Sequence, residues 1–316
     1  MILPQARIAR ISRAMLAAVL AAIVAGLCIC APKIVWGASP ELAAAGSFFL
    51  PGLGQAANSD YGKAGLHFGS ALVLASQYSI QVEKEDYILP ADRVDNKNKE
   101  IDINRTSYEA DLWGSALFNL SLYSSFAAYR DGRQAISNQG YETPAPGESL
   151  ADLASAPFQW DLLIRPTTFV PLLIPLYFAL TPPADEQFLF NPDDSITREE
   201  MAVGFAVRHN MVAVGEEAFF RGLLNNGFSS SFGDTYGLLT SSVIFGLAHQ
   251  GNAGQATAAG AGLFGLYIGY LQQINGYRID QGVAVHFWWN FLVSVGMLAQ
   301  RKTDRELRLL TFYTEF

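Results

Sequence analysis

Apolar residues gather into long blocks along the chain, separated by shorter hydrophilic stretches. The first block spans 14–31, and seven more lie near 62–80, 109–129, 166–182, 201–226, 236–250, 256–275 and 281–299. Several blocks reach the ~20 residues that a helix needs to cross a bilayer. Backbone groups in lipid must pair within their own segment, so such blocks form helices rather than isolated strands. The pattern predicts an all-α fold, a polytopic integral membrane helical bundle of about seven or eight transmembrane helices.

Two hydrophilic stretches divide the chain into modules. Residues 81–106 mix acidic and basic side chains, whereas residues 130–160 are rich in Gly, Pro, Ser and Ala. We therefore expect five parts: a signal peptide or N-terminal membrane anchor (1–38), a small helical membrane module with a hydrophilic loop (39–135), a linker (136–160), a second membrane domain (161–300) and a basic tail (301–316).

The first apolar block follows three arginines, which is typical of signal peptides and of first membrane anchors. Pro32 and Trp36 disfavour cleavage at the nearby alanines, so we favour an uncleaved anchor. Eight spans would place the N-terminal arginines, the 81–106 loop and the basic tail together on the cytoplasmic side. The acidic loop at 183–199 fits that arrangement poorly.

Composition narrows the classes of function. The 316 residues are 50% hydrophobic and 16% charged, with a net charge of −8. This negative charge argues against nucleic acid as a partner, because nucleic-acid surfaces are basic. The two cysteines, Cys28 and Cys30, both lie in the first apolar block. They cannot form a disulfide framework for the rest of the protein, and we interpret them as small hydrophobes.

Three of the C-terminal blocks contain polar residues that a membrane helix normally avoids. They are Glu216, Glu217 and Arg221 in the first, Phe245 and His249 in the second, and His286 and Asn290 in the third. An ionisable side chain at the bilayer centre costs ~2.5–3.5 kcal/mol on insertion scales, so residues of this kind mark functional sites. Two carboxylates, one arginine and two histidines are sufficient groups for activating a water molecule.

The first motif offers two carboxylates with different surroundings. Glu217 and Arg221 are four residues apart, so a helix places them on one face as an ion pair. Glu216 points about 100° away from Glu217 and faces a separate pocket. We assign Glu216 the role of general base and the Glu217–Arg221 pair a mainly structural one. The alternative is that all three charges only hold one helix against another.

The histidines differ in how strongly their neighbours indicate a role. His286 and Asn290 share one helix face and supply both donors and acceptors. His249 closes a short block, and an isolated histidine there is more often a packing residue than a functional one. The chain has four histidines, and the other two, His67 and His209, have no such partners in the sequence. We interpret both as bystanders.

The ordered set of motifs resembles the CPBP family of intramembrane proteases, which includes the type II CAAX prenyl endopeptidases and the Abi bacteriocin self-immunity proteins. Its motifs E-E-x-x-x-R, F-x-x-x-H and H-x-x-x-N/B match Glu216, Glu217 and Arg221, then Phe245 and His249, then His286 and Asn290. The resemblance covers about residues 160–300, so domain 161–300 would be the protease domain. It implies an endopeptidase of the membrane, in bacteria the cytoplasmic membrane, whose substrate is a membrane-associated peptide or protein.

The resemblance also implies a role for each residue. Glu216, helped by His249, would polarise a water molecule for attack on the scissile carbonyl. His286 and Asn290 would stabilise the oxyanion or hold the water. The other motif residues would support this site: Glu217, Arg221 and Phe245.

Metal dependence stays open at this point. Glu216, His249 and His286 could ligate Zn²⁺ and leave one position for water. We favour the metal-free mechanism, because a paired glutamate and arginine is not a familiar arrangement of zinc ligands.

Two functions other than proteolysis fit the same residues. A non-catalytic scaffold or bacteriocin-immunity protein could use the polar cluster as a binding site. An ion or proton-coupled transporter, which we rank lower, could relay protons along buried carboxylates and histidines.

The protease hypothesis sets a geometric condition. His249 ends its block, whereas His286 lies near the start of a helix that should run in the same direction. The two side chains meet only if the helices tilt, or if the 236–250 helix stops inside the membrane beside a polar cavity.

The N-terminal module carries a fainter resemblance. Pro51, Gly52, Gly54 and Gln55 match the P-G-x-G-Q signature of small two-helix membrane modules. A tight turn between helices explains the glycines and the proline equally well, so we assign no site residue there.

Overall fold

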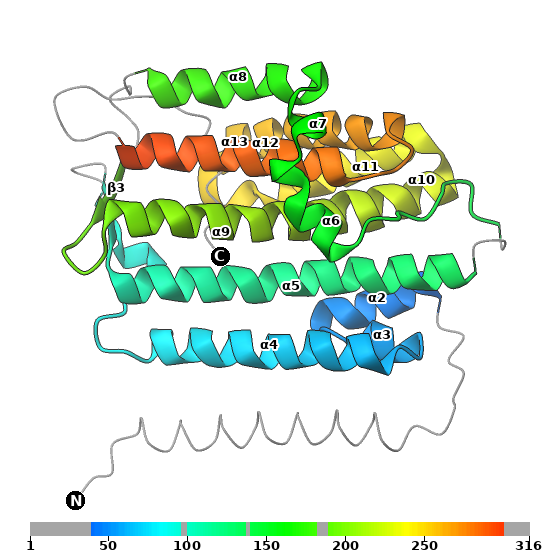
Figure 1. Ribbon diagram of the computed structural model, residues 1–316, viewed down its shortest axis with the longest axis horizontal. Coiled ribbons are helices and arrows are strands. Elements are labelled where there is room, and N and C mark those ends of the chain that lie inside the picture. Colours follow the sequence, from blue (N-terminus) through cyan, green and yellow to red (C-terminus); the bar gives the residue numbers. More distant parts are fainter. Residues whose placement is uncertain (1–38, 96–99, 137–139, 182–188, 300–316) are drawn as a thin grey trace, which may run out of the picture.

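The computed structural model describes residues 39–95, 100–136, 140–181 and 189–299. Most of these residues are helical, and the long helices run nearly parallel or antiparallel to one another (Figure 1). The predicted all-α class is therefore confirmed, apart from one small sheet. The first apolar block, with Cys28 and Cys30, and the basic tail fall outside the described residues.

Each of the seven later apolar blocks forms a helix. They are α4 (Tyr61–Val82), α5 (Arg105–Ala135), α8 (Pro166–Leu180), α9 (Arg198–Glu216), α11 (Asp234–Ala248), α12 (Gln250–Ile274) and α13 (Asp280–Ala299). Helix α9 continues directly into the π-helix η3 (Glu217–Asn225) and then into α10 (Asn226–Phe232). The shorter elements are α2 (Pro40–Phe49), α3 (Leu53–Ala57), α6 (Leu150–Ser155), α7 (Trp160–Leu163) and the 3₁₀ turns η1 (Pro90–Asp92) and η2 (Ala156–Phe158).

The predicted count of seven or eight membrane spans is not confirmed. By length and composition, one helix in the described ranges, Asp280–Ala299, could cross a membrane, and Pro166–Leu180 is apolar but shorter. The other helices carry polar positions that are buried against neighbouring helices. In α5, for example, Asn119, Ser124 and Arg133 are each at most 3% exposed. Their polarity lowers the hydropathy of the helix although its partners in the bundle cover them.

The P-G-x-G-Q segment forms the tight turn that leads from α2 into α3. Gly52 has a φ of +97°, a conformation that favours glycine. At Gly54 a Cβ would lie 2.0 Å from the carbonyl oxygen of Ala43. Gln55 is buried and donates a hydrogen bond to the Ser124 carbonyl at 2.8 Å. The turn is thus fixed against α5.

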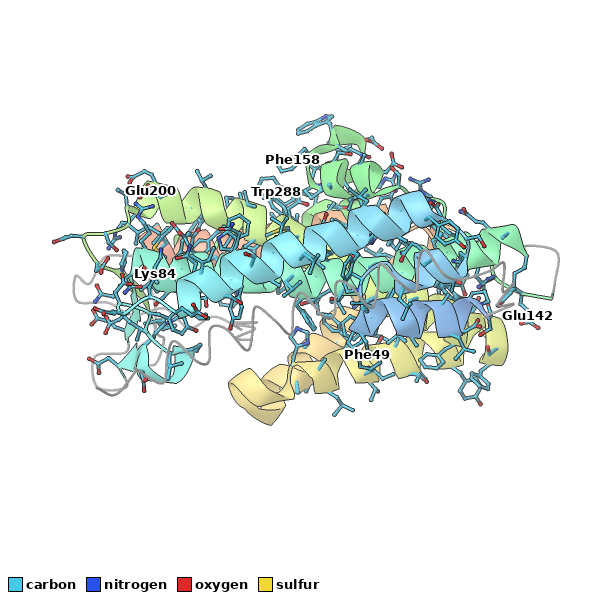
Figure 2. All side chains as sticks on the ribbon, turned by 90° about the horizontal axis from the view of Figure 1, so that it is seen from below. Phe49, Lys84, Glu142, Phe158, Glu200 and Trp288 are labelled. Atoms are coloured by element: carbon cyan, nitrogen blue, oxygen red, sulfur yellow. The ribbon has the colours of Figure 1, made fainter. Side chains whose placement is uncertain are left out.

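Two hydrophilic loops meet at one end of the bundle. Strand β1 (Val94–Asp95) pairs antiparallel with β2 (Glu100–Ile103), and β2 pairs parallel with β3 (Leu189–Pro192). Beside them Arg105 donates to both carboxylate oxygens of Glu200, at 2.9 and 3.0 Å. Figure 2 shows Lys84 and Glu200 at this end of the long axis and Glu142 at the other. Strand β3 of the acidic loop therefore lies beside β2 of the 81–106 loop and pairs with it.

The core that positions the site lies between α5, α9 and α13. Its central cluster includes Phe126 from α5, Val214 from α9 and Phe287 from α13, each at most 5% exposed. Gly215 allows close contact between α9 and α5, because a Cβ there would lie 2.4 Å from Oδ1 of Asn119. Burial of these side chains holds η3, which follows α9, at a fixed distance from α13.

We expect Gly54→Ala to lower the free energy of unfolding by ~1–3 kcal/mol, because the new methyl group overlaps the Ala43 carbonyl. Gly65→Ala is the matched control, since nothing lies within 4 Å of a Cβ at that helical position. Thermal unfolding of the purified variants in detergent checks both, and equal losses would contradict the close contact at Gly54.

Candidate functional site

The first motif lies where the helix changes its pitch. Glu216 ends α9, and Glu217 begins the π-helix η3. Segments of π-helix are rare and occur frequently at functional sites. Glu216, Glu217 and Arg221 are all buried, with at most 2% exposure. The sequence predicts an α-helix here, and it carries no recognised signal for the wider turn.

The expected ion pair forms within η3. Arg221 Nε lies 3.2 Å from Glu217 Oε2, and both side chains are almost completely buried. The guanidinium also lies over the Phe245 ring, 4.3 Å from its centroid, in a cation–π contact. Gly265 of α12 makes room for it, because a Cβ there would lie 3.1 Å from Nη2 of Arg221. Phe245 and α12 therefore enclose the arginine.

The second oxygen of Glu217 contacts a histidine from another helix. His286 Nδ1 lies 2.7 Å from Glu217 Oε1. An ionised carboxylate only accepts, so we assign the proton to Nδ1 of His286. This contact turns Nε2 of His286 toward Glu216. The sequence predicted one partner for Glu217, and the structure gives it two.

His249 lies at the junction of two helices. Helix α11 ends at Ala248 and α12 begins at Gln250, so His249 is the single residue between them. His249 Nδ1 lies 2.7 Å from the Phe245 carbonyl oxygen, which can only accept, so Nδ1 carries a proton. The short helix thus stops where His249 and His286 both approach Glu216, and the geometric condition is met.

Both imidazoles face the same carboxylate oxygen. Glu216 Oε2 lies 3.9 Å from Nε2 of His249 and 3.8 Å from Nε2 of His286. Within the described part of the chain this oxygen has no hydrogen-bond partner. The separations are too long for direct hydrogen bonds and suit a group that bridges them.

A small pocket lies at this convergence. Its lining residues are Val212, Glu216, Phe245, His249, Phe264, His286 and Asn290. The space open to the centre of a water molecule is about 10 Å³, close to the ~10–15 Å³ that one water requires. Phe264, which the sequence analysis missed, presents its ring edge-on to His286 at a centroid distance of 5.5 Å. The structure thus brings together all four residues predicted to be catalytic.

One predicted bystander has a partner after all. His209 Nε2 lies 2.8 Å from Oγ of Ser294, which is one turn beyond Asn290 on α13. This contact ties α9 to α13 next to the pocket, and no short-range pattern in the sequence could have paired the two residues. His67 stacks on Tyr123 and does not line the pocket.

The three side chains suggested as zinc ligands do not fit that ion in this arrangement. A tetrahedral zinc at ~2.0–2.1 Å from its ligands holds neighbouring ligand atoms ~3.3–3.4 Å apart. The separations from Glu216 Oε2 to His249 and His286 are wider, at 3.9 and 3.8 Å. Among the described residues, no group of three or more His, Cys, Asp or Glu side chains is arranged to hold a metal ion.

Comparison with protein families bears on the same segment. Residues 199–292 match the family model described as type II CAAX prenyl endopeptidase Rce1-like. The predicted family resemblance is confirmed. The Rce1-like match contains every residue of the three motifs, from Glu216 to Asn290. The family comprises peptidases that are integral membrane proteins and act on membrane-associated proteins. No curated protein and no solved structure matches the chain.

We expect Arg221→Met in the Rce1-like segment to lower the free energy of unfolding by ~3–5 kcal/mol, because it leaves the buried Glu217 carboxylate without its cation. Replacing both partners, as Glu217→Gln with Arg221→Met, should recover most of this loss, since the buried carboxylate that Arg221 faced is then also absent. Denaturant unfolding in detergent checks the difference.

Arg105→Met is the matched control for this prediction. Its ion pair with Glu200 is exposed, so we expect a loss of at most ~1 kcal/mol. A loss at Arg221 no larger than that at Arg105 would contradict the structural role of the buried pair.

Proposed function

We propose that the chain is an intramembrane endopeptidase that hydrolyses a peptide bond of a membrane-associated protein with a water activated by Glu216 and His249. One observation carries the proposal. Within the Rce1-like segment, Glu216 Oε2 and the Nε2 atoms of His249 and His286 converge at 3.8–3.9 Å around space for one water.

Rows of exposed apolar side chains support a membrane setting. On α4, Leu66, Val73 and Ile80 recur every seven residues and are 67, 59 and 50% exposed. Helices α8, α11 and α12 carry further large apolar residues of this kind. Extended apolar surface marks contact with lipid or protein. Such rows suit helices whose outer faces lie in lipid while their polar positions pack inward.

The buried charges in the proposed site balance when His286 is doubly protonated. Glu216 and Glu217 contribute two negative charges, and Arg221 and His286 then contribute two positive ones. Glu217 Oε1, 2.7 Å from Nδ1, is the counter-ion for that imidazolium. The water donates its two hydrogens to Glu216 Oε2 and His249 Nε2, while Nε2–H of His286 donates to the water oxygen. The facing atoms of Glu216, His249 and His286 are then all paired with the water, as burial requires.

Hydrolysis begins with proton transfer to the carboxylate. Glu216 removes one proton from the water as the water oxygen attacks the carbonyl carbon of the scissile peptide bond. His249 accepts the other hydrogen in a hydrogen bond and so orients the attacking lone pair. A new C–O bond forms and the carbonyl π electrons move to oxygen, which gives a tetrahedral oxyanion.

Donors on α13 stabilise that oxyanion. The Asn290 amide and Nε2–H of His286 are four residues apart on one helix face and both line the pocket. Fixed donors of this kind are worth ~10²–10³ in rate each. Collapse of the intermediate breaks the C–N bond, and protonated Glu216 returns its proton to the leaving nitrogen. One water is consumed, and the products are a carboxylic acid and an amine.

We expect Glu216→Gln and His249→Ala each to lower kcat by ~10²–10⁴, because each removes a group that acts on the attacking water. Cleavage of a membrane-anchored reporter in proteoliposomes measures this. His67→Ala is the control, since His67 lies outside the pocket, and its turnover per folded protein should not change.

Unchanged cleavage by stably folded Glu216→Gln and His249→Ala would refute the protease proposal. Wild-type binding of the reporter without cleavage would favour a scaffold or immunity protein instead. Proton flux into sealed liposomes without cleavage would favour a transporter.

We expect chelation to leave wild-type turnover unchanged within about twofold, because the wide spacing of Glu216, His249 and His286 does not fit tetrahedral zinc. Treatment with 1,10-phenanthroline, together with elemental analysis of the purified chain, checks this. Zinc present at about one ion per chain, with activity lost on removal and restored on addition, would contradict the metal-free mechanism.

A further inference from the structure

A carboxylate from outside the Rce1-like segment binds the start of the helix that carries His286. Glu148 is 1% exposed, and its Oε1 accepts from the backbone N–H groups of Ile279 at 2.6 Å and Asp280 at 3.4 Å. These N–H groups lie at the N-terminus of α13, where no carbonyl of the same helix is available to them. The positive end of the helix dipole also favours a negative charge there.

The segment that carries Glu148 is itself fixed to the helices around the site. We call residues 141–149 the strap. Arg130 of α5 donates to the Glu148 carbonyl at 2.7 Å, and buried Arg133 donates to the Thr143 carbonyl. Asn226, the first residue after η3, donates to the Pro144 carbonyl at 2.9 Å. The strap therefore links the end of η3 to the start of α13.

This link bears on the position of His286 along its helix. His286 lies six residues after Asp280, which is ~9 Å along the axis at 1.5 Å per residue. Gly282 lies between these two residues, and a Cβ there would be 2.7 Å from Ile268 and 3.5 Å from Glu217 Oε2. A shift of α13 by ~2 Å along its axis would lengthen the 2.7 Å contact between His286 and Glu217 to ~3.4 Å, beyond the usual hydrogen-bonding distance.

We propose that Glu148 is a positioning residue for His286: by capping α13 from the strap, it sets the height at which the imidazole meets Glu217 and Glu216. Its effect on turnover rests on the proposed protease function, whereas its effect on the geometry of His286 does not. Without the carboxylate, two buried N–H groups lose their acceptor, and α13 moves to recover other partners.

A first experiment tests the geometry of His286, and it uses the full chain labelled with ¹⁵N-histidine in nanodiscs. The Nδ1 proton of His286 should give a downfield, slowly exchanging signal that Glu217 holds in place, assigned by its loss in His286→Gln. We expect Glu148→Ala to abolish or broaden this signal. Glu148→Gln should preserve it, because the amide oxygen still accepts from Ile279. Glu148→Asp, whose side chain is one methylene shorter, should shift the His286 signal. This variant replaces Glu148→Ala in the test if the alanine variant does not fold.

Asp60→Ala is the matched control. Asp60 is also a carboxylate that caps a helix, since it accepts from the Lys63 N–H at 3.0 Å, but it caps α4 and contacts neither the strap nor α13. Its loss should leave the His286 signal unchanged. An unchanged His286 signal in folded Glu148→Ala or Glu148→Asp would overturn the proposal, as would an equal change in Asp60→Ala.

A second experiment measures kinetics, and it separates the positioning of His286 by Glu148 from a simple loss of folded protein. We expect Glu148→Ala to lower kcat at least ~10-fold with KM within about twofold, and Glu148→Gln to restore most of it. In a His286→Ala background, Glu148→Ala should cost nothing further, because the residue through which it acts is gone. Additive losses would overturn the proposal. If wild-type protein cleaves no reporter, the protease function fails, and the His286 signal alone decides the role of Glu148.

Discussion

The Glu217 carboxylate is the group on which the site depends. It is completely buried, and such a charge costs several kcal/mol unless it is paired and hydrogen-bonded. One oxygen lies against Arg221 within η3, and the other accepts from His286 of α13. Because each oxygen has its own partner, Glu217 fixes the distance between the two elements. Its neighbour Glu216 is left to face the pocket.

The two adjacent glutamates take different surroundings where α9 passes into the π-helix η3. A helical step of about 100° already turns consecutive side chains toward different neighbours. Glu217 faces Arg221 and His286, whereas Oε2 of Glu216 faces both histidines. Phe245 then serves both parts of the site, since its ring covers Arg221 and its carbonyl orients His249. This is a physical reason for an aromatic residue four positions before the histidine.

Part of this site can be predicted from the sequence, because an ionisable side chain in an apolar segment costs free energy and is visible without knowledge of distant contacts. Ionisable residues such as Glu216 and His249 stand out in apolar blocks, and their order resembles one family of motifs. The contacts of Glu217 with His286 and of Glu148 with α13 join residues 69 and 131 positions apart, and no local periodicity reports them. The small sheet was missed for another reason, since strands of two to four residues are too short to show alternation. Hydropathy likewise does not report that polar residues of α5, such as Asn119 and Arg133, pack inward.

The pocket contains a buried carboxylate oxygen that lowers the stability of the fold, and the proposed hydrolysis explains why it is there. A buried oxygen without a hydrogen-bond partner costs ~1–3 kcal/mol, and Glu216 Oε2 is such an atom within the described residues. A fold selected for stability alone could remove this cost with an apolar residue at position 216 or with a donor within hydrogen-bonding distance of its side chain. Both histidines instead direct their Nδ1 protons away from Glu216, to Glu217 and to the Phe245 carbonyl. In the proposed mechanism, Glu216 Oε2 and His249 Nε2 therefore remain as acceptors for a bound water, and stability is given up where that water would react.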